Sequence, residues 1–374
     1  MSHPLFSETY VEARAKFIGA ADASGHHVEP HVHPNERAPG GEELSMDVVW
    51  FGPKDAKGVL LNLSGTHGCE GFAGSAAQVN WIENRGFEHL PKDTALLMVH
   101  GVNPYGFSHF SRCTEDNVDL NRNWIDFSEP LPENPNYMRY HAIQCPKLLN
   151  EESEKQILRD LGTLARERGH WEIEDAMSRG QYDVPDGIGF GGQAPTWSRE
   201  ILSGVIRKNL GDAEKVALLD WHTGTPGMAE IIYLCYSEPG TIHYDNAAHL
   251  WGEENIRPQK VDEQWGNKRP GRVGVMYWGI RDIVEDLGGE CAGGVIEIGT
   301  RPEKDLRAAA RAGIYDRYLR FESDRFAPEN AELLDTILRA FYPHDDEAWK
   351  IKALEKSVAI YERTLKGLRE WVES

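Results

Sequence analysis

Short apolar runs alternate with amphipathic stretches through most of the chain, and this pattern predicts a layered α/β fold. Five short runs are rich in apolar residues, as is typical of strands that helices cover on both faces. They lie at residues 47–50, 58–64, 94–100, 215–221 and 294–299. Apolar residues at helical spacing predict helices over 71–84 and 151–168, and again beyond residue 330. Because the alternation runs through most of the chain, we expect one domain over residues 1–374.

Three stretches differ from this alternation. We interpret residues 128–213 as an insertion, in which a Gly-rich loop at 186–197 either lines a cleft or faces solvent. Residues 330–374 are predicted to form a helical C-terminal extension. Its apolar stripes face the core or a second copy of the chain, which leaves a homo-oligomer open. The histidines at 26, 27, 31 and 33 lie beside two prolines, so we expect a loop there that leads into the strand at 47–50, with little support for a metal site.

The first candidate for chemistry is His67-Gly-Cys-Glu70, in the turn that follows the predicted strand 58–64. Open α/β sheets build their binding sites at the carboxyl ends of strands. His67 and Glu70 would supply an imidazole and a carboxylate from one turn, which are two of the three protein ligands of a catalytic zinc. Taken alone, this short motif more often describes a turn histidine and a helix-capping glutamate.

Two later strands carry residues that complete such a site. His222 ends the predicted strand 215–221 and is the best candidate for a second imidazole. Asp220 beside it either orients a neighbouring group or is an ordinary turn or capping aspartate. Glu297 lies within a strand between two isoleucines, and a buried carboxylate without a partner is costly, which favours a functional role. It would accept the proton of a metal-activated water, unless it simply lies on the exposed face of an edge strand.

A polar loop that follows strand 94–100 carries Arg112, Asp119, Asn121 and Arg122. An arginine fork binds a carboxylate through two hydrogen bonds, and an asparagine adds a further donor. Arg112 comes from another part of the loop and would stabilise a developing oxyanion. Asp119 would hold the second nitrogen of a metal-binding imidazole. The alternative is a loop held together by its own salt bridges.

In this order the motifs resemble those of the zinc carboxypeptidase (M14-like) superfamily. The surrounding Ser-Gly-Thr-His-Gly-Cys-Glu-Gly-Phe-Ala-Gly-Ser and Gly-Gly-Gln-Ala-Pro-Thr-Trp-Ser resemble its DUF2817 branch, and the resemblance covers residues 5–320. It implies an α/β fold with a single zinc-carboxypeptidase-like domain, in which a mixed twisted sheet has helices on both faces.

The resemblance also implies a set of roles for the candidate residues. These are Zn²⁺ bound by His67, Glu70 and His222, Glu297 as general base, Arg112 at the oxyanion, Asn121 and Arg122 clamping a substrate carboxylate, and Asp119 behind the first histidine. The tyrosine with which secreted members cover their substrate is matched only loosely by Tyr277, because Gly-Val-Met-Tyr-Trp does not follow their loop, so this assignment stays open.

Three functions fit these residues. The first is a zinc carboxypeptidase acting on peptides, and the second is a zinc deacylase of N-acyl amino acids, similar to aspartoacylase and succinylglutamate desuccinylase, which share the motifs. The third is a non-catalytic binding protein that kept the fold. The intact Glu297 argues against the third, because a binding module has no need of a base.

Charge and cysteine usage narrow the partners. With 40 Lys and Arg against 60 Asp and Glu, the net charge is −20, which argues against nucleic acid and anionic membranes. No apolar run approaches the roughly 20 residues of a membrane span. The first residues lack the features of a signal peptide, and the five scattered cysteines indicate reduced thiols. We therefore expect a cytoplasmic enzyme acting on a small peptide or an N-acyl amino acid.

Overall fold

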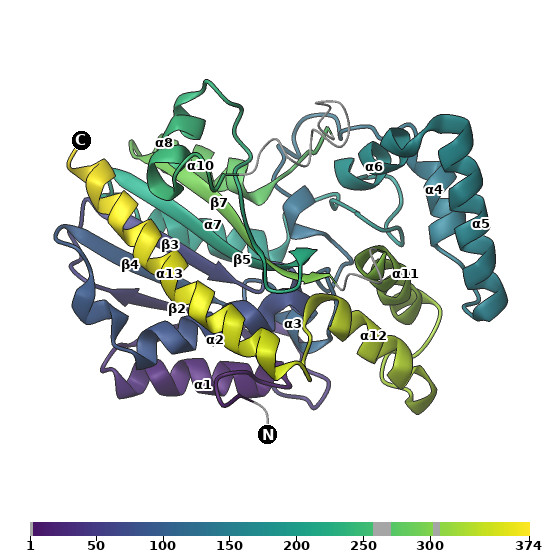
Figure 1. Cartoon of the computed structure of the whole chain (residues 1–374), viewed down its shortest axis with the longest axis horizontal. Helices are drawn as coiled ribbons and strands as arrows, with labels where there is room; N and C mark the ends of the chain where they lie inside the picture. The colour runs from purple at the N-terminus through teal and green to yellow at the C-terminus, as the bar shows by residue number, and fades with distance from the viewer. Residues whose placement is uncertain (1–2, 257–270, 302–306) are drawn as a thin grey trace.

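A mixed β-sheet forms the centre of the molecule in the computed structural model, which describes residues 3–256, 271–301 and 307–374 (Figure 1). Within these residues the sheet has seven strands in the order β1-β2-β4-β3-β5-β7-β6. Strands β4, β3, β5 and β7 run parallel, whereas β1, β2 and β6 join antiparallel to their neighbours. The bounds are β1 Val28–Arg37, β2 Glu43–Phe51, β3 Gly58–Ser64, β4 Thr94–His100, β5 Lys215–Gly227, β6 Ile231–Leu234 and β7 Glu290–Arg301.

The five predicted strands are confirmed, and the site's geometry follows from their order. All residues of β3 and β4 are buried, as expected for central strands covered on both faces. β3 lies between β4 and β5, and β5 lies beside β7. Since parallel strands end at the same edge of a sheet, the turns after β3, β4 and β5 meet there.

The prediction of a loop at the histidine-rich stretch is wrong. Residues 28–37 form β1, an edge strand paired antiparallel with β2. Pro30 and Pro34 led the sequence interpretation away from a strand, yet a proline is tolerated on an edge strand, where its missing N–H is not needed by a neighbour. His33 Nε2 lies 3.1 Å from Glu115 Oε1, so this histidine ties the edge strand to the loop that follows β4.

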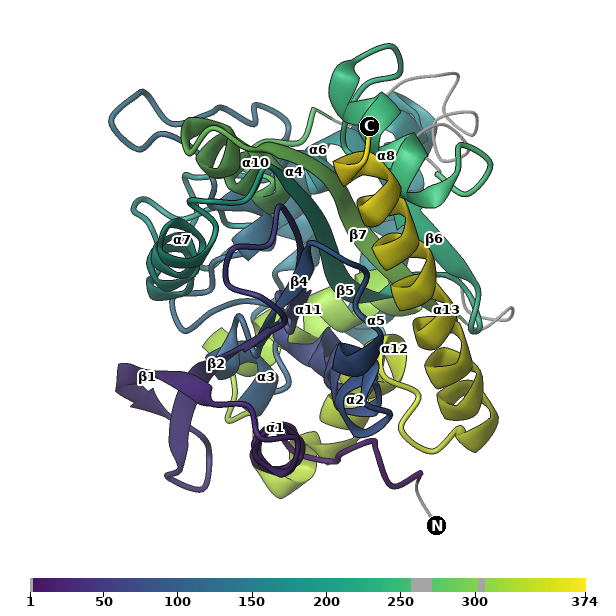
Figure 2. The ribbon, with the colours of Figure 1, turned by 90° about the vertical axis from the view of Figure 1, so that its left-hand side faces the viewer.

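Helices cover both faces of the sheet, which confirms the predicted mixed α/β architecture (Figure 2). One face carries α1 (Tyr10–Ala23), α2 (Gly71–Glu83), α8 (Ile242–Trp251) and α13 (Glu347–Val372), packed around Phe17, Phe72 and Trp221. The other carries α7 (Trp197–Asn209) and α10 (Met276–Asp286), packed through Leu202 and Ile280. α13 buries Trp349, Tyr361 and Leu368, so the C-terminal stripe that the sequence shows faces the core.

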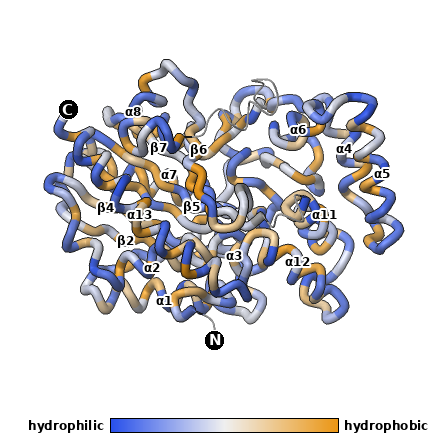
Figure 3. Tube along the Cα trace, viewed as in Figure 1, coloured by the Kyte–Doolittle hydropathy of each residue, from blue (hydrophilic) through white to orange (hydrophobic). Residues whose placement is uncertain are grey.

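The remaining helices gather at the carboxyl end of the strands. They are α3 (Pro104–Ser108), α4 (Tyr137–Gln144), α5 (Glu151–Arg168), α6 (His170–Arg179), α11 (Ala308–Phe321) and α12 (Ala331–Phe341), with short 3-10 turns η1 (Gly68–Glu70), η3 (Leu120–Arg122) and η4 (Pro328–Asn330). A further 3-10 turn, η2 (Gly86–His89), lies between α2 and the start of β4. Hydrophobic residues concentrate along the central strands, and hydrophilic residues mark the outer turns (Figure 3). Among the described residues, no helix combines the length and the apolar character that crossing a membrane requires.

Candidate active site

The turn between β3 and α2 presents His67 and Glu70. His67 has extended backbone angles and precedes η1, so its side chain and that of Glu70 leave the same tight turn. Gly68 makes this turn possible, because a Cβ there would lie 1.9 Å from the carbonyl carbon of Gly106. The neighbouring Cys69 is fully buried in the hydrophobic cluster formed with α11 and α12.

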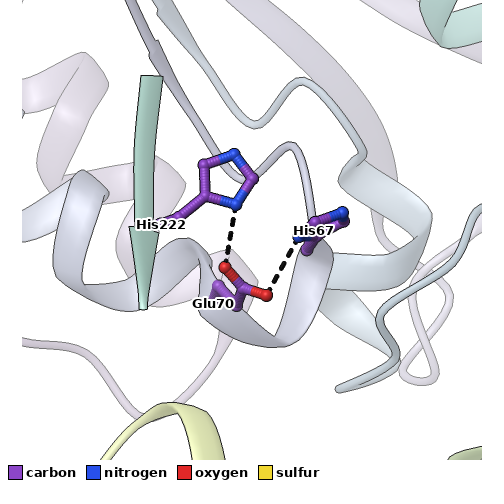
Figure 4. Close-up of side chains that lie close together, drawn as sticks. All are labelled: His67, Glu70 and His222. Carbon is purple, nitrogen blue, oxygen red and sulfur yellow. Dashed lines mark hydrogen bonds and ion pairs between the residues drawn. The ribbon is translucent and has the colours of Figure 1, made fainter. Parts of the chain in front are cut away.

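His222, from β5, meets this turn, and the three side chains face one another (Figure 4). One ligand atom each of His67, Glu70 and His222 lies within 4.8 Å of the other two, and all three side chains are buried. The Nδ1 atoms of His67 and His222 each lie 3.0 Å from a different oxygen of Glu70. Two imidazoles and one carboxylate suit zinc, which takes three such ligands in hydrolytic enzymes and leaves a fourth position open.

The far nitrogen of each imidazole is held by an aspartate. His67 Nε2 lies 3.1 Å from Asp119 Oδ1, and His222 Nε2 lies 2.7 Å from Asp220 Oδ2. A carboxylate behind an imidazole fixes its orientation and raises its basicity toward a metal. Asp220 accepts a further hydrogen bond from Thr66 Oγ1 at 2.8 Å, a contact that the sequence did not reveal. Both aspartates therefore occupy the supporting place that the sequence proposed for Asp119 and left open for Asp220.

Glu297 supplies a carboxylate with no ion pair recorded to any of the described residues. It pairs with His222 across β5 and β7, and paired residues of neighbouring strands project to the same face. Its Oε2 atom is buried and has no hydrogen-bond partner. Burial and the nearby Glu70 raise the pKa of Glu297 to about 8, against the opposing influence of His222 and Arg112. A divalent cation at the cluster would offset this crowding of negative charge, so the residues present fit the proposed metal.

Arg112 lies against two of these carboxylates. Its Nη1 donates to Glu70 Oε1 at 3.0 Å, and its Nε donates to Asp119 Oδ2 at 3.2 Å. Burial alone would lower its pKa, but Asp119 and Glu70 raise it above the ordinary value. The side chain keeps 32% of its surface exposed, so one side of the guanidinium remains open beside the cluster. A permanent positive charge therefore stands at the edge of the site.

Asn121 and Arg122 lie in η3 and leave their donors available. Asn121 Oδ1 accepts from the backbone N–H of Met276 at 3.1 Å, so its two Nδ2 hydrogens are the donors it can offer a ligand. Arg122 donates from Nη1 to the carbonyl of Asn121 at 2.6 Å, while its Nε is buried without a partner. Asp119 caps this turn by accepting from the N–H of Asn121 at 2.9 Å.

The Gly-rich loop predicted at 186–197 is hydrogen-bonded to the residues on either side of η3. The N–H of Asp119 donates to the carbonyl of Phe190 at 2.8 Å, and Asn123 Nδ2 donates to the carbonyl of Gly191 at 2.8 Å. Tyr182 Oη donates to the carbonyl of Arg122 at 2.6 Å. This part of the 128–213 segment thus fixes the backbone of Asn121 and Arg122.

The structure does not bring Tyr277 to the site. Its side chain is 2% exposed within the core cluster of α7 and α10, and its hydroxyl lies 3.3 Å from Ser237 Oγ. Its neighbour Tyr236 packs 6.4 Å from the Tyr277 ring, measured between ring centroids, and burial raises the pKa of Tyr236 against the charges of Arg272 and His222. Tyr236 lies two residues after β6, and no other feature of the sequence distinguishes it from the remaining tyrosines.

The chain is similar to solved structures of carboxypeptidases and of a desuccinylase. Carboxypeptidase A from Helicoverpa armigera aligns with 12% identity and a TM-score of 0.44, over 94% of this chain and 73% of that chain. Bovine thrombin-activatable fibrinolysis inhibitor aligns with 12% identity and a TM-score of 0.44, over 96% of this chain and 98% of that chain. A succinylglutamate desuccinylase from Silicibacter sp. TM1040 aligns with 14% identity and a TM-score of 0.36, over 79% of this chain and 67% of that chain.

No curated protein matches the chain. A family model does, and it is described as a protein of unknown function (DUF2817). The match runs over residues 6–356 and so includes all the site residues named above. The chain therefore belongs to the DUF2817 family.

Proposed function

We propose that this protein is a zinc-dependent hydrolase that cleaves an amide bond next to a free carboxylate, and that it acts as a carboxypeptidase. The observation that carries the proposal is the cluster of His67, Glu70 and His222, whose inward nitrogens share one carboxylate. The aspartates behind both imidazoles support it, because a metal site needs its ligands oriented in advance.

The reaction needs a proton acceptor, and Glu297 is placed to be one. Zinc bound at the cluster would polarise the scissile carbonyl and make a water molecule more acidic. Glu297, on the strand beside His222, takes a proton from that water as the oxygen of the water bonds to the carbonyl carbon. It then delivers the proton to the leaving nitrogen as the carbon–nitrogen bond breaks. Arg112 supports the negative charge that develops on the carbonyl oxygen.

We assign recognition of the substrate carboxylate to the residues of η3. Asn121 and Arg122 have unused donors there, and together they bind the carboxylate next to the cleaved bond. The Gly-rich loop holds their backbone in place, so little ordering is left to occur on binding.

Hydrolysis of a substrate panel by the zinc-loaded full chain tests this function. We expect release of the C-terminal residue from short peptides with a free carboxylate. Faster release of amino acids from N-acyl amino acids would favour the deacylase instead, and turnover of neither class would favour a binding protein. Each outcome is read against the zinc content of the same sample.

Glu297→Gln tests the proton acceptor directly. We expect it to keep zinc and substrate affinity but to lose about 10²-fold or more in kcat, the usual scale for a positioned general base. Glu290→Gln is the matched control, because Glu290 lies on the same strand with half of its side chain exposed and an ion pair to Lys215. A near-normal kcat in Glu297→Gln would remove this residue from the reaction.

A further inference from the structure

Arg122 holds more hydrogen-bonding capacity than one carboxylate clamp explains. A guanidinium carries five N–H donors. Arg122 is 9% exposed; within the described residues its Nη1 bonds to the carbonyl of Asn121, and its buried Nε has no partner. Buried donors left unpaired are unfavourable in a folded protein, so these atoms point to a ligand.

A second arginine, Arg272, is held beside Arg122 by the backbone on either side of it. Gly271 donates its N–H to Asp175 Oδ1 at 2.8 Å, and Val273 donates its N–H to the carbonyl of Arg179 at 3.2 Å. Both acceptors belong to α6, so the segment is fixed at two points around Arg272. The side chain of Asp175 is also paired with Arg179 at 2.9 Å. Asp175 is therefore already engaged and leaves the charge of Arg272 unmatched.

Gly274 lets the segment that carries Arg272 approach the backbone of Arg122 closely. Its carbonyl accepts from the N–H of Trp124 at 3.1 Å, and its φ is +68°, where glycine is favoured. A Cβ at this position would lie 2.2 Å from the carbonyl oxygen of Arg122. Only a residue without a side chain permits this approach, so the backbone two residues after Arg272 touches the backbone of Arg122.

Arg272 adds a positive charge that has no counterpart among the described residues. The structure records no hydrogen bond or ion pair for its guanidinium there. Its charge, together with burial and Arg112, lowers the pKa of Arg122 against the influence of Asp119. It also acts on Tyr236, whose other charged neighbours include His222 and Glu297. The backbone contact of Gly274 with Arg122 therefore keeps Arg272 close to the clamp, with no recorded partner for its guanidinium among the described residues.

We propose that Arg272 forms a second anion subsite beside the clamp of Asn121 and Arg122, so that the preferred substrate carries two carboxylates. One lies next to the cleaved bond and is held by Asn121 and Arg122, and the other is held by Arg272. Two unpaired guanidiniums repel each other, and a dicarboxylate removes that repulsion while filling donors on both. The identity of the reaction rests on the function proposed above, whereas the binding of a second carboxylate can be measured without turnover.

Calorimetry with matched ligands tests the subsite. L-Glutamate against L-glutamine probes an acidic group on the leaving amino acid, and succinate against succinamate probes one on the acyl group. Each pair differs by one carboxylate replaced with an amide of the same shape. We expect the zinc-loaded protein to bind the dicarboxylate of at least one pair about tenfold or more tightly, as a charge-assisted hydrogen bond in a partly buried site implies.

Three variants locate that preference. Arg272→Gln should abolish it, Arg272→Lys should retain part of it, and Arg281→Gln should leave it unchanged. Arg281 is the control because it removes the same charge from α10 while being paired with Asp282 at 2.6 Å. A preference that survives in Arg272→Gln, or no preference in the unmodified protein, would overturn the proposal.

Hydrolysis distinguishes the subsite from the reaction. If N-acetylglutamate and N-acetylglutamine are hydrolysed equally well and neither calorimetric pair is discriminated, the subsite is refuted while the hydrolase stands. If discrimination depends on Arg272 but no peptide or N-acyl amino acid is hydrolysed, the subsite stands and the proposed reaction is refuted.

Discussion

Asp316 on α11 ties the loop that carries Arg112 to the core, and replacing its charge tests how much that tie stabilises the protein. Its Oδ2 accepts from the N–H of Arg112 at 2.9 Å and from Ser111 Oγ at 3.0 Å. Arg325 Nη2 donates to its Oδ1 at 2.5 Å. The carbonyl of Arg112 accepts in turn from the N–H of Gly68, in the turn that carries the proposed metal ligands. One carboxylate thus anchors a loop that reaches the site.

The expected loss of stability in Asp316→Asn follows from the burial of the pair that Asp316 forms with Arg325. Asp316 and Arg325 are both below a tenth exposed, so Asp316→Asn keeps the shape but leaves a buried guanidinium without its counter-charge. Breaking a buried pair in this way costs about 3–5 kcal/mol. Although burial alone would raise the pKa of Asp316, Arg325 and Arg320 hold it below its ordinary value. The stabilisation that ionised Asp316 gives the folded protein is fully present above the pKa of the unfolded chain, near 3.9. It is lost as pH falls through the pKa of Asp316 in the folded protein.

Urea unfolding of the zinc-loaded protein at pH 7 measures the loss. Asp335→Asn is the matched control, because Asp335 also pairs with an arginine, Arg339, but both side chains are nearly half exposed. An exposed pair contributes about 0–1 kcal/mol. We also expect Asp316→Asn to lower kcat through the displaced Arg112, and its deficit in stability to narrow below about pH 4. A loss no larger than that of Asp335→Asn would refute the anchoring role.

Three further predictions follow from the site and the core. His222→Ala should lose most of its zinc, measured by metal analysis after dialysis, while His243→Ala, outside the site and paired with Glu285, should keep it; stoichiometric zinc in the first variant would remove His222 from the cluster. Amidating the substrate carboxylate should lower kcat/KM by a few kcal/mol in transition-state free energy, since Arg122 loses its charged partner; equal cleavage of both forms would contradict the clamp. Burial lowers the pKa of His100 to about 4, so only the unfolded state binds its proton as pH falls from about 6.5 to 4. Up to about 3 kcal/mol of stability should be lost over that range, and His100→Gln should lose less in parallel urea titrations; identical pH profiles would contradict this.

Local pattern alone determined the strands and the first half of the site. β3 and β4 were predictable because central strands bury every side chain, which leaves an apolar run of the right length. His67 and Glu70 were predictable because both come from one turn directly after such a strand. The edge strand β1 was missed, since a strand with only one neighbour needs neither continuous apolar residues nor every N–H.

The tertiary structure determined which residues from distant parts of the sequence come together at the site. His222, Asp220 and Glu297 were recognisable by type, but only the adjacency of β3, β5 and β7 sets which atoms face one another. The family resemblance matched Tyr277 only loosely and left its role open, and packing buries this tyrosine in the core. Nothing around Arg272 distinguishes it in the sequence. Its importance arises because backbone hydrogen bonds and one glycine hold it against a clamp 150 residues earlier, a contact that exists only once the chain has folded.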